Sequence, residues 1–421
     1  MSIDFSASLD DKADMTLDEA MALDRADPLA PLRDRFSLPD GVIYLDGNSL
    51  GALPRAVAPR VAAAVTGEWG QDLITSWNVH DWIDLPARAG EKIARLVGAE
   101  PGSVVVADST SVNIFKALGA ALRMRPSRPV ILTEAQNFPT DTYIAQAIAD
   151  FAGNRRVVEA DAAGLVAAMT DEVAVVLLTE VNYRTGARLD MKRLTQAAHD
   201  AGALIVWDLA HSAGALPVRL ADAGADFAIG CGYKYLNGGP GAPAFVYVAP
   251  RHQAEAMQPL AGWLGHATPF TFSPAYEPAP GAARFRTGTP AVLSMTALDA
   301  ALDAFDGVDL AVLRAKADAL FDLFTRYVAD NCPQLELLTP RDPGQRGTQM
   351  SFRHPQAYAV MQALIARNVI GDFREPDIMR FGLTPLYLRY EDIYRAAGTL
   401  CDVVNSGAWD TPQFRQRNKV V

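Results

Sequence analysis

The stretch DMKRLTQAAHDAGALIVWDLAHSAG, residues 190–214, contains a helix pattern, a buried-strand pattern and a polar turn in succession. Its first half has apolar residues at helical spacing and ends in Gly202, which is typical of a helix C-terminus. The following run, ALIVW, predicts a short strand that is buried on both faces. A helix that leads directly into such a strand is the repeating unit of a helix-covered sheet, so this stretch predicts an α/β fold.

The same alternation extends over most of the chain. Further strands are expected at SVVVA (103–107), PVILT (129–133), VAVVLL (173–178), DFAIG (226–230) and PAFVYV (243–248). We therefore expect a large domain over residues 55–300, with a mostly parallel sheet of the seven-stranded type flanked by helices. Residues 301–421 alternate short strands with helices and predict a smaller α+β domain, which the N-terminal segment, residues 1–54, is expected to join.

Composition narrows the class of protein. Half of the 421 residues are hydrophobic, and the net charge of −11 makes nucleic acid an unfavourable partner. The three cysteines form no CxxC pair and are odd in number, which argues against a disulfide framework and for a reducing compartment. No Cys/His cluster indicates a metal site. No apolar run reaches the roughly 18 residues of a membrane span, and no signal peptide is evident, so we expect a cytoplasmic protein.

Polar side chains follow each of five expected strands, where ligands bind in open α/β sheets. The stretches are DSTSVN (108–113), EAQNFPTD (134–141), TEVNYRTG (179–186), DLAHSAG (208–214) and CGYKYLNGGPG (231–241). Each alone has a structural explanation: Asp208 could cap a helix, His211 could be a core histidine, and Lys234 could be a solvated turn residue. Together, at five consecutive strand ends, they predict one polar site.

The residue types in this predicted site suit pyridoxal phosphate. The Lys234 amine can condense with an aldehyde, and Asp208, at the end of the preceding strand, can keep a pyridine nitrogen protonated. Hydroxyls at residues 109–111, at the start of an expected helix, suit a phosphate group. Phe138 could stack on the cofactor ring.

Several of these stretches closely resemble the kynureninase family, pyridoxal phosphate enzymes of the aspartate-aminotransferase-like superfamily. The resemblance covers about residues 44 to 390. Its stretches are YLDGNSLG (44–51), NFPTD (137–141), VNYRTG (181–186), DLAHSAG (208–214), CGYKYLNGGPG (231–241), GWLGH (262–266), RTGTP (286–290) and RFGLTPLY (380–387). The lysine stretch alone also occurs in relatives such as cysteine desulfurases, so the combination is what makes the match specific.

The resemblance implies a role for each matching residue. Lys234 would bond covalently to the cofactor and shuttle protons with Tyr233, while Asp208 pairs with the ring nitrogen. The other cofactor contacts are implied at the phosphate end (Thr110, Ser111, Asp141), over the ring (Phe138), near the cofactor (Thr179, His211) and across a dimer interface (Trp263, Thr289). The substrate contacts are Arg380, which would clamp the α-carboxylate, Trp77 and Ser49.

The resemblance further implies a homodimer that hydrolyses L-kynurenine, or its 3-hydroxy form, to anthranilate and L-alanine. The small Gly288 and Thr289 favour kynurenine itself. Structural alternatives stay open for three residues: Trp263 and Trp77 could be packing residues, and Arg380 could pair with a nearby acid such as Asp377.

Three other functions are weighed against this one. A cysteine desulfurase needs a cysteine on a mobile loop, whereas Cys231 directly follows an expected strand. A non-catalytic regulator predicts an eroded site, yet the lysine, acid, histidine and phosphate hydroxyls are all present. A nicotinamide dehydrogenase needs a GxGxxG after its first strand, and this sequence has none there.

Overall fold

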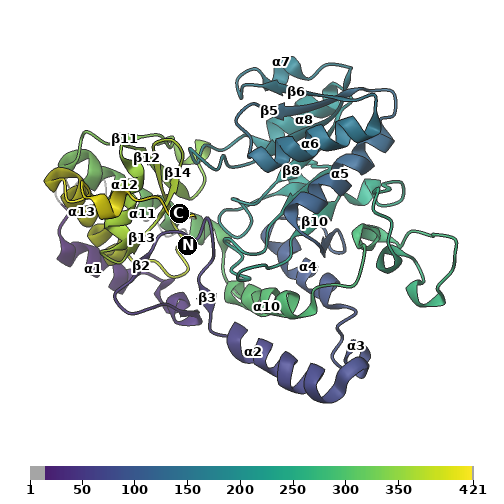
Figure 1. Ribbon diagram of the computed structural model, residues 1–421, viewed down its shortest axis with the longest axis horizontal. Helices are drawn as coiled ribbons and strands as arrows, with labels where there is room; N and C mark the ends of the chain where they lie inside the picture. The colour runs from purple at the N-terminus through teal and green to yellow at the C-terminus, as the bar shows by residue number, and fades with distance from the viewer. Residues whose placement is uncertain (1–14, 420–421) are drawn as a thin grey trace. The chain divides into compact units, whose positions relative to one another are not determined.

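The computed structural model describes residues 15–419 and divides into two compact units. The large unit comprises Ala56–Tyr183 and Arg188–Asp303. The small unit comprises, among the described residues, 15–55, Arg184–Ala187 and 304–419; α1 (Leu17–Ala26) at its N-terminal end is dark purple and its C-terminal part is yellow-green in Figure 1.

The large unit is built on a seven-stranded sheet (Figure 1). Its strands, in spatial order, are β4 (Val104–Val106), β10 (Phe245–Val248), β9 (Phe227–Gly230), β8 (Leu204–Asp208), β7 (Val173–Thr179), β5 (Val130–Glu134) and β6 (Arg156–Ala160). Strands β9, β8, β7, β5 and β6 are parallel, and only β10 runs antiparallel to its neighbours β4 and β9. The prediction of an α/β fold with a mostly parallel seven-stranded sheet is confirmed.

Continuous apolar runs become the central strands because both faces of the sheet are covered. All seven residues of β7 are buried, whereas the edge strand β6 leaves Arg156 and Glu159 exposed. Helices α5 (Thr110–Met124), α6 (Pro139–Ala152) and α8 (Met191–Asp200) pack on this sheet. The apolar side of α5 joins the core through Ile114 and Ala117.

Parallel strands bring their polar ends to one edge of the sheet. In the register of β7 and β8, Thr179 lies opposite Asp208, and β9 ends beside them at Gly230. The segments that follow these strands therefore start from the same edge, as the sequence predicts. This edge holds the candidate site of the large unit.

The small unit contains a four-stranded antiparallel sheet in the order β11 (Glu336–Leu337), β12 (Gln349–Arg353), β15 (Ile378–Gly382), β14 (Asp372–Arg374). Its main helices are α1 (Leu17–Ala26), α11 (Leu310–Asn331), α12 (Ala357–Ile365) and α13 (Tyr390–Ser406). A parallel pair of β2 (Ile43–Tyr44) and β13 (Val369–Ile370) connects the N-terminal segment to the rest of the unit.

Two further features concern the whole described chain. Within residues 15–419, no helix combines the length and the apolar character that a membrane crossing requires. All three cysteines, Cys231, Cys332 and Cys401, are buried free thiols.

Candidate functional site

Lys234 lies in the turn after β9 and approaches a histidine from the turn after β8. Its Nζ is 3.0 Å from Nε2 of His211, which is itself buried. The same Nζ is 6.0 Å from the ring centre of Phe138 and 5.9 Å from that of Tyr233. The structure thus brings together four predicted residues from the ends of three strands.

Asp208 and Asp141 form a buried carboxyl pair at the same sheet edge. The two side chains hydrogen-bond each other, and Oδ1 of Asp208 also accepts a bond of 2.6 Å from the backbone N–H of Ala210. Burial raises the pKa of both carboxyls, and the Asp208 charge raises that of Asp141 further. Because donors from Ala210 and the Lys234 charge favour an ionised Asp208, the shared proton belongs on Asp141.

Thr179 and Asn137 complete this hydrogen-bond network. The Thr179 hydroxyl contacts Oδ1 of Asn137 at 2.5 Å and Oδ2 of Asp141 at 3.3 Å. The Asn137 amide donates to Thr133 Oγ1 at 3.0 Å. Sequence analysis placed Thr179 and Asp141 in the site but gave Asn137 no role. The signal that could have identified Asn137 is its position as the first residue of the NFPTD stretch (137–141).

The N-terminus of α5 presents the hydroxyls predicted for a phosphate. Ser109 is the helix cap, with its Oγ accepting from the Val112 N–H at 3.4 Å. Thr110 and Ser111, the next two residues, are partly exposed and are not used as the cap. Phe138 at the start of α6 is 39 % exposed and packs edge-on against Tyr183. The side chains of Thr110, Ser111 and Phe138 are therefore accessible to a ligand.

An ion pair between a buried lysine and an exposed aspartate fixes the loop before α5. Lys116 is fully buried, forms an ion pair with Asp108, and donates to the Phe285 carbonyl oxygen at 2.6 Å. Burial lowers the pKa of Lys116, while Asp108 opposes that change. Asp108 and Thr289 line one cavity of about 210 Å³. Asp108 belongs to the predicted polar stretch 108–113, but its pairing with Lys116 was not predicted, because a lysine seven residues into a helix is usually an ordinary surface charge.

Trp263 and Trp77 differ in their surroundings. Trp263 is 40 % exposed and stacks with Phe272, a ring that is itself mainly exposed. Trp77 packs edge-on against Trp82, whose indole N–H donates to Glu68 at 2.7 Å. Trp77 therefore has a packing partner within the large unit, whereas Trp263 leaves much of its ring accessible.

Arg380 lies on β15 of the small unit and is almost fully buried. Its Nε donates to Oδ1 of Asp372 at 2.7 Å, and its Nη2 donates to Ser49 Oγ at 3.2 Å. Its acid partner is thus Asp372, on the neighbouring strand β14. Asp377, the partner that the sequence suggested, lies 3.2 Å from Arg353 instead. The structure brings Ser49 and Arg380 together, as two predicted substrate contacts.

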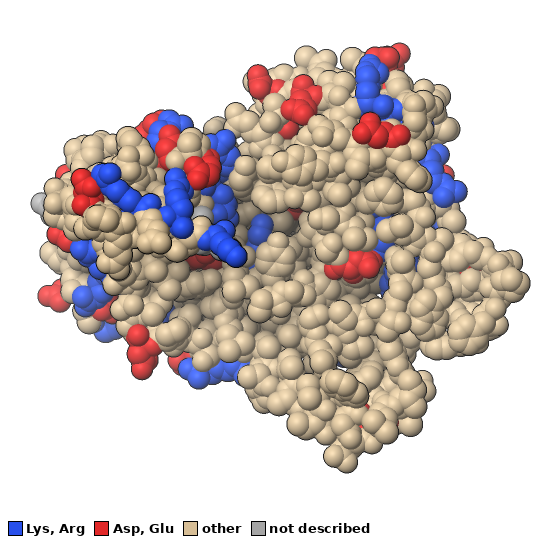
Figure 2. Space-filling model, in the orientation of Figure 1, with Lys and Arg blue, Asp and Glu red and all other residues tan. Residues whose placement is uncertain are grey.

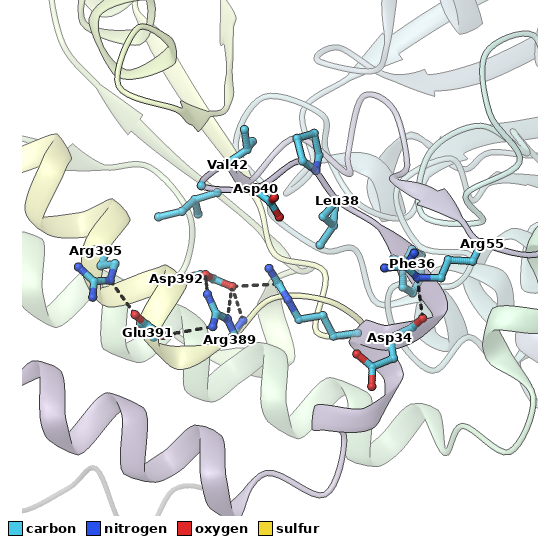
Figure 3. Close-up of a pocket in the computed structure, with 14 residues that line it drawn as sticks. Asp34, Phe36, Leu38, Asp40, Val42, Arg55, Arg389, Glu391, Asp392 and Arg395 are labelled. Atoms are coloured by element: carbon cyan, nitrogen blue, oxygen red, sulfur yellow. Dashed lines mark hydrogen bonds and ion pairs between the residues drawn. The ribbon is translucent and has the colours of Figure 1, made fainter.

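A separate cavity, of about 490 Å³, lies in the small unit and is lined by many charged side chains (Figure 3). They point toward one another: Arg389 pairs with Asp392 at 2.7 Å, and Arg395 pairs with Glu391 at 2.9 Å (Figure 3). Arg33 also reaches Asp392, at 3.1 Å. Because these charges are matched internally, the cavity has no excess charge to attract an ionic ligand.

Cys231 has none of the properties of a nucleophile on a mobile loop. Its thiol is buried and lies 3.8 Å from the carbonyl oxygen of Ala210. Burial raises its pKa, which keeps the thiol in the unreactive protonated form. Cys332 and Cys401 are buried as well. The desulfurase alternative therefore has no support in the positions of the three cysteines.

Comparison with known proteins gives relatives over nearly the whole chain. Kynureninase of Burkholderia pseudomallei (strain K96243) is 53 % identical over 414 residues, which cover 96 % of this chain and 99 % of the relative. Kynureninase of Deinococcus radiodurans is 56 % identical over 391 residues, or 91 % of this chain and 95 % of the relative. The family model of the kynureninase C-terminal domain matches residues 313–400.

Solved structures with the same fold have lower sequence identity. A cysteine desulfurase from Thermococcus onnurineus NA1 has a TM-score of 0.76 and 18 % identity, covering 89 % of this chain and 98 % of its own. A C-DES mutant with glycine covalently linked to the PLP cofactor has a TM-score of 0.75 and 21 % identity, covering 88 % and 99 %. The similarity to these solved structures shows the fold, whereas the sequence identity to the two kynureninases shows the family. The chain belongs to the kynureninase family.

Proposed function

We propose that this protein hydrolyses L-kynurenine to anthranilate and L-alanine with pyridoxal phosphate as cofactor. The observation that carries the proposal is the position of the Lys234 amine, 3.0 Å from His211 at the sheet edge that also holds the Asp208–Asp141 pair. Membership of the kynureninase family supports the substrate, and the buried cysteines disfavour desulfuration.

The residues at this edge fit the cofactor chemically. With the shared proton on Asp141, the Asp208 carboxylate is a buried anion with which a protonated ring nitrogen could pair. We assign that contact to Asp208, with Asp141 as the neutral acid that holds it. This assignment puts Asp141 at the nitrogen side of the site, not at the phosphate end that the resemblance implies, and leaves Thr110, Ser111 and the first N–H groups of α5 for the phosphate. Phe138 would cover the ring.

When bound, pyridoxal phosphate supplies an electron sink for the bonds that break next to the substrate amine. Lys234 is the amine to which its aldehyde would bond, and once released it is placed to move protons at the substrate carbons. His211 Nε2 holds and orients that amine at 3.0 Å. Burial raises the pKa of Tyr233, so its hydroxyl stays protonated and can donate a hydrogen bond.

In the small unit, Arg380 is the residue that would bind the α-carboxylate of the substrate. Asp372 holds its guanidinium by two hydrogen bonds, and Ser49 holds it by a third. A guanidinium fixed in this way is pre-organised for a carboxylate, which it recognises by planar, paired hydrogen bonds.

We also propose that the protein is a cytoplasmic homodimer. Several large apolar side chains of the large unit are exposed, including Ile74 and Phe272 at 75 % and Trp263 at 40 %. The region of α2 (Val57–Ala63) and α3 (Ser76–Val79) shows few charged side chains in Figure 2. Exposed apolar groups of this kind favour a protein interface. Three free thiols are consistent with a reducing compartment.

The test is the conversion of kynurenine by purified protein supplied with pyridoxal phosphate, followed by anthranilate fluorescence. We expect turnover by the wild type, none by Lys234→Ala, and full turnover by the matched control Lys192→Ala, whose side chain is exposed on α8. Wild-type protein that binds the cofactor but leaves kynurenine intact would refute the substrate. An active Lys234→Ala would refute the role of Lys234.

A further inference from the structure

Arg380 lies in a cluster of two aspartates, Asp372 and Asp46, and two arginines, Arg380 and Arg374, around Ser49. We call this cluster the carboxylate clamp. Asp372 receives most of the donors: Arg380 Nε at 2.7 Å, Arg374 Nη2 at 2.9 Å and Ser49 Oγ at 2.5 Å. Burial opposes its ionisation, but Arg380, Arg374 and Ser49 together outweigh burial and hold the pKa of Asp372 below its usual range. Asp372 is therefore the permanent anion of the cluster.

Asp46 is the second acid of this cluster, and Ser49 is its hydrogen-bonding neighbour there, while Arg380 and Arg374 act on it through their charge. It follows β2, its carbonyl oxygen accepts from the Ser49 N–H at 3.0 Å, and its backbone forms a bridge with Gly382 at the end of β15. Its Oδ1 is buried and has no hydrogen-bond partner within residues 15–419. Burial, followed by the charge of Asp372, raises the pKa of Asp46 to about 7, although Ser49, Arg380 and Arg374 lower it.

The charge count of the cluster depends on Asp46. With Asp46 ionised, two carboxylates match two guanidinium groups and the cluster is neutral. With Asp46 protonated, the cluster has one positive charge in excess. The remaining titratable neighbour, Tyr44, is kept neutral, because burial and the two aspartates raise its pKa. Only the proton of Asp46 therefore changes the net charge of the clamp near neutral pH.

We propose that Asp46 controls the affinity of Arg380 for the substrate carboxylate, and that the form which binds the carboxylate is the one with Asp46 protonated. The inference rests on the proposed function, in which Arg380 binds that carboxylate. Asp46 acts through Arg380 and is a positioning residue. Its proton neutralises the acid that would otherwise repel the incoming anion in a poorly solvated site.

The sign of the pH dependence follows. Below the Asp46 pKa the cluster attracts an anion, and above it the attraction is lost, so affinity falls as pH rises. A bound carboxylate disfavours the ionised form of Asp46, so binding is accompanied by proton uptake. The effect belongs to KM and to inhibitor affinity, whereas kcat at saturating substrate is much less affected.

The experiment measures inhibition of kynurenine hydrolysis by propionate, which carries a carboxylate but no amine and stays ionised throughout. Between about pH 6 and about pH 8.5 we expect the wild-type Ki to rise about tenfold. Asp46→Asn, which is neutral at every pH, should keep its Ki constant within about twofold over that range. Asp377→Asn, an acid near the same strands that pairs with Arg353, serves as the control and should behave as the wild type.

Each outcome decides one question. A Ki that is flat with pH in the wild type overturns the inference whatever the variants do, and so does an Asp46→Asn protein with the wild-type slope. If Asp46→Asn does not fold, Asp46→Ser removes the same charge with a smaller side chain and is judged by the same slope. Absence of kynurenine turnover at every pH would instead contradict the proposed function.

Discussion

Two pairs of aspartates, Asp208 with Asp141 in the large unit and Asp372 with Asp46 in the small unit, differ in the cations beside them. In the large unit, Asp208 and Asp141 have Lys234 nearby, and burial raises the pKa of both. In the small unit, the fork of Arg380 lowers the pKa of Asp372 despite burial. Two arginines and a serine hydroxyl together thus outweigh the cost of burying the Asp372 carboxylate, whereas the one lysine near Asp208 and Asp141 does not.

The difference in charge between the two aspartate pairs suits two different ligand groups, a cationic ring nitrogen and a substrate carboxylate. The acid pair of the large unit keeps one carboxylate, Asp208, beside the neutral Asp141, so it suits a cationic ring nitrogen. The cluster of the small unit balances its own charges, so it gains affinity for an anion only by taking up a proton at Asp46.

The largest expected effect is that of Asp208→Asn. It removes the acid that would hold the ring nitrogen protonated, so kcat should fall by about 10²–10³, as when a single preorganised electrostatic group is removed. Anthranilate formation at saturating kynurenine and cofactor measures it. Asp222→Asn, on an exposed helical turn, is the matched control. Wild-type kcat in Asp208→Asn would show that Asp208 is not the electrostatic partner.

Arg380→Ala should act on substrate affinity. Loss of charge-assisted hydrogen bonds to the carboxylate should raise KM for kynurenine about 10²-fold and leave cofactor absorbance nearly unchanged. Arg380→Lys keeps the charge without the fork and should lie between the two. Arg353→Ala, an exposed arginine on β12, is the control. An unchanged KM would assign the carboxylate to another group.

Asp226 tests the opposite case, a buried acid with a full set of donors. It contacts His199, His252, Arg251 and the Ile205 N–H at 2.6–2.9 Å. Burial is outweighed by the two histidine contacts, and its pKa lies well below the usual range. Asp226→Asn should therefore reduce the free energy of unfolding by about 3 kcal/mol in urea denaturation at neutral pH.

The pH dependence of this difference has a definite sign. Because the folded-state pKa of Asp226 is depressed, its stabilisation is present above the ordinary aspartate pKa and is lost as pH falls below it. The gap between wild type and Asp226→Asn should thus shrink in acid, while the exposed control Asp171→Asn should match the wild type throughout. A gap that widens in acid would contradict the assignment.

The smallest effect is expected for Asp141→Asn. Because Asp141 is the neutral acid of its pair, an amide of the same shape can also donate to Asp208, and kcat should change by less than about fivefold. Comparison of its kcat with that of Asp208→Asn measures which acid carries the charge. Equal losses in the two variants would mean that the charge is shared.

The sequence predicts the strands and their polar ends well, because continuous apolar runs fix the sheet and parallel strands bring their ends to one edge. Lys234, His211 and Asp208 could be found in this way. The pairing of Arg380 with Asp372 could not, since β14 and β15 meet through an antiparallel register that local patterns leave open. Likewise, the pKa of Asp46 depends on Asp372 and Arg380, which lie more than three hundred positions away in the sequence.

The most direct test concerns the identity of the lysine that bears the cofactor. Lys116 and Lys316 are buried but are each paired with an aspartate, whereas the partly buried Lys234 is held by a histidine. Borohydride treatment of the purified, cofactor-loaded protein fixes the bond, and peptide mass spectrometry locates it. We expect the pyridoxyl label on Lys234; a label on Lys116 or Lys316, with Lys234 unmodified, would contradict the proposed site.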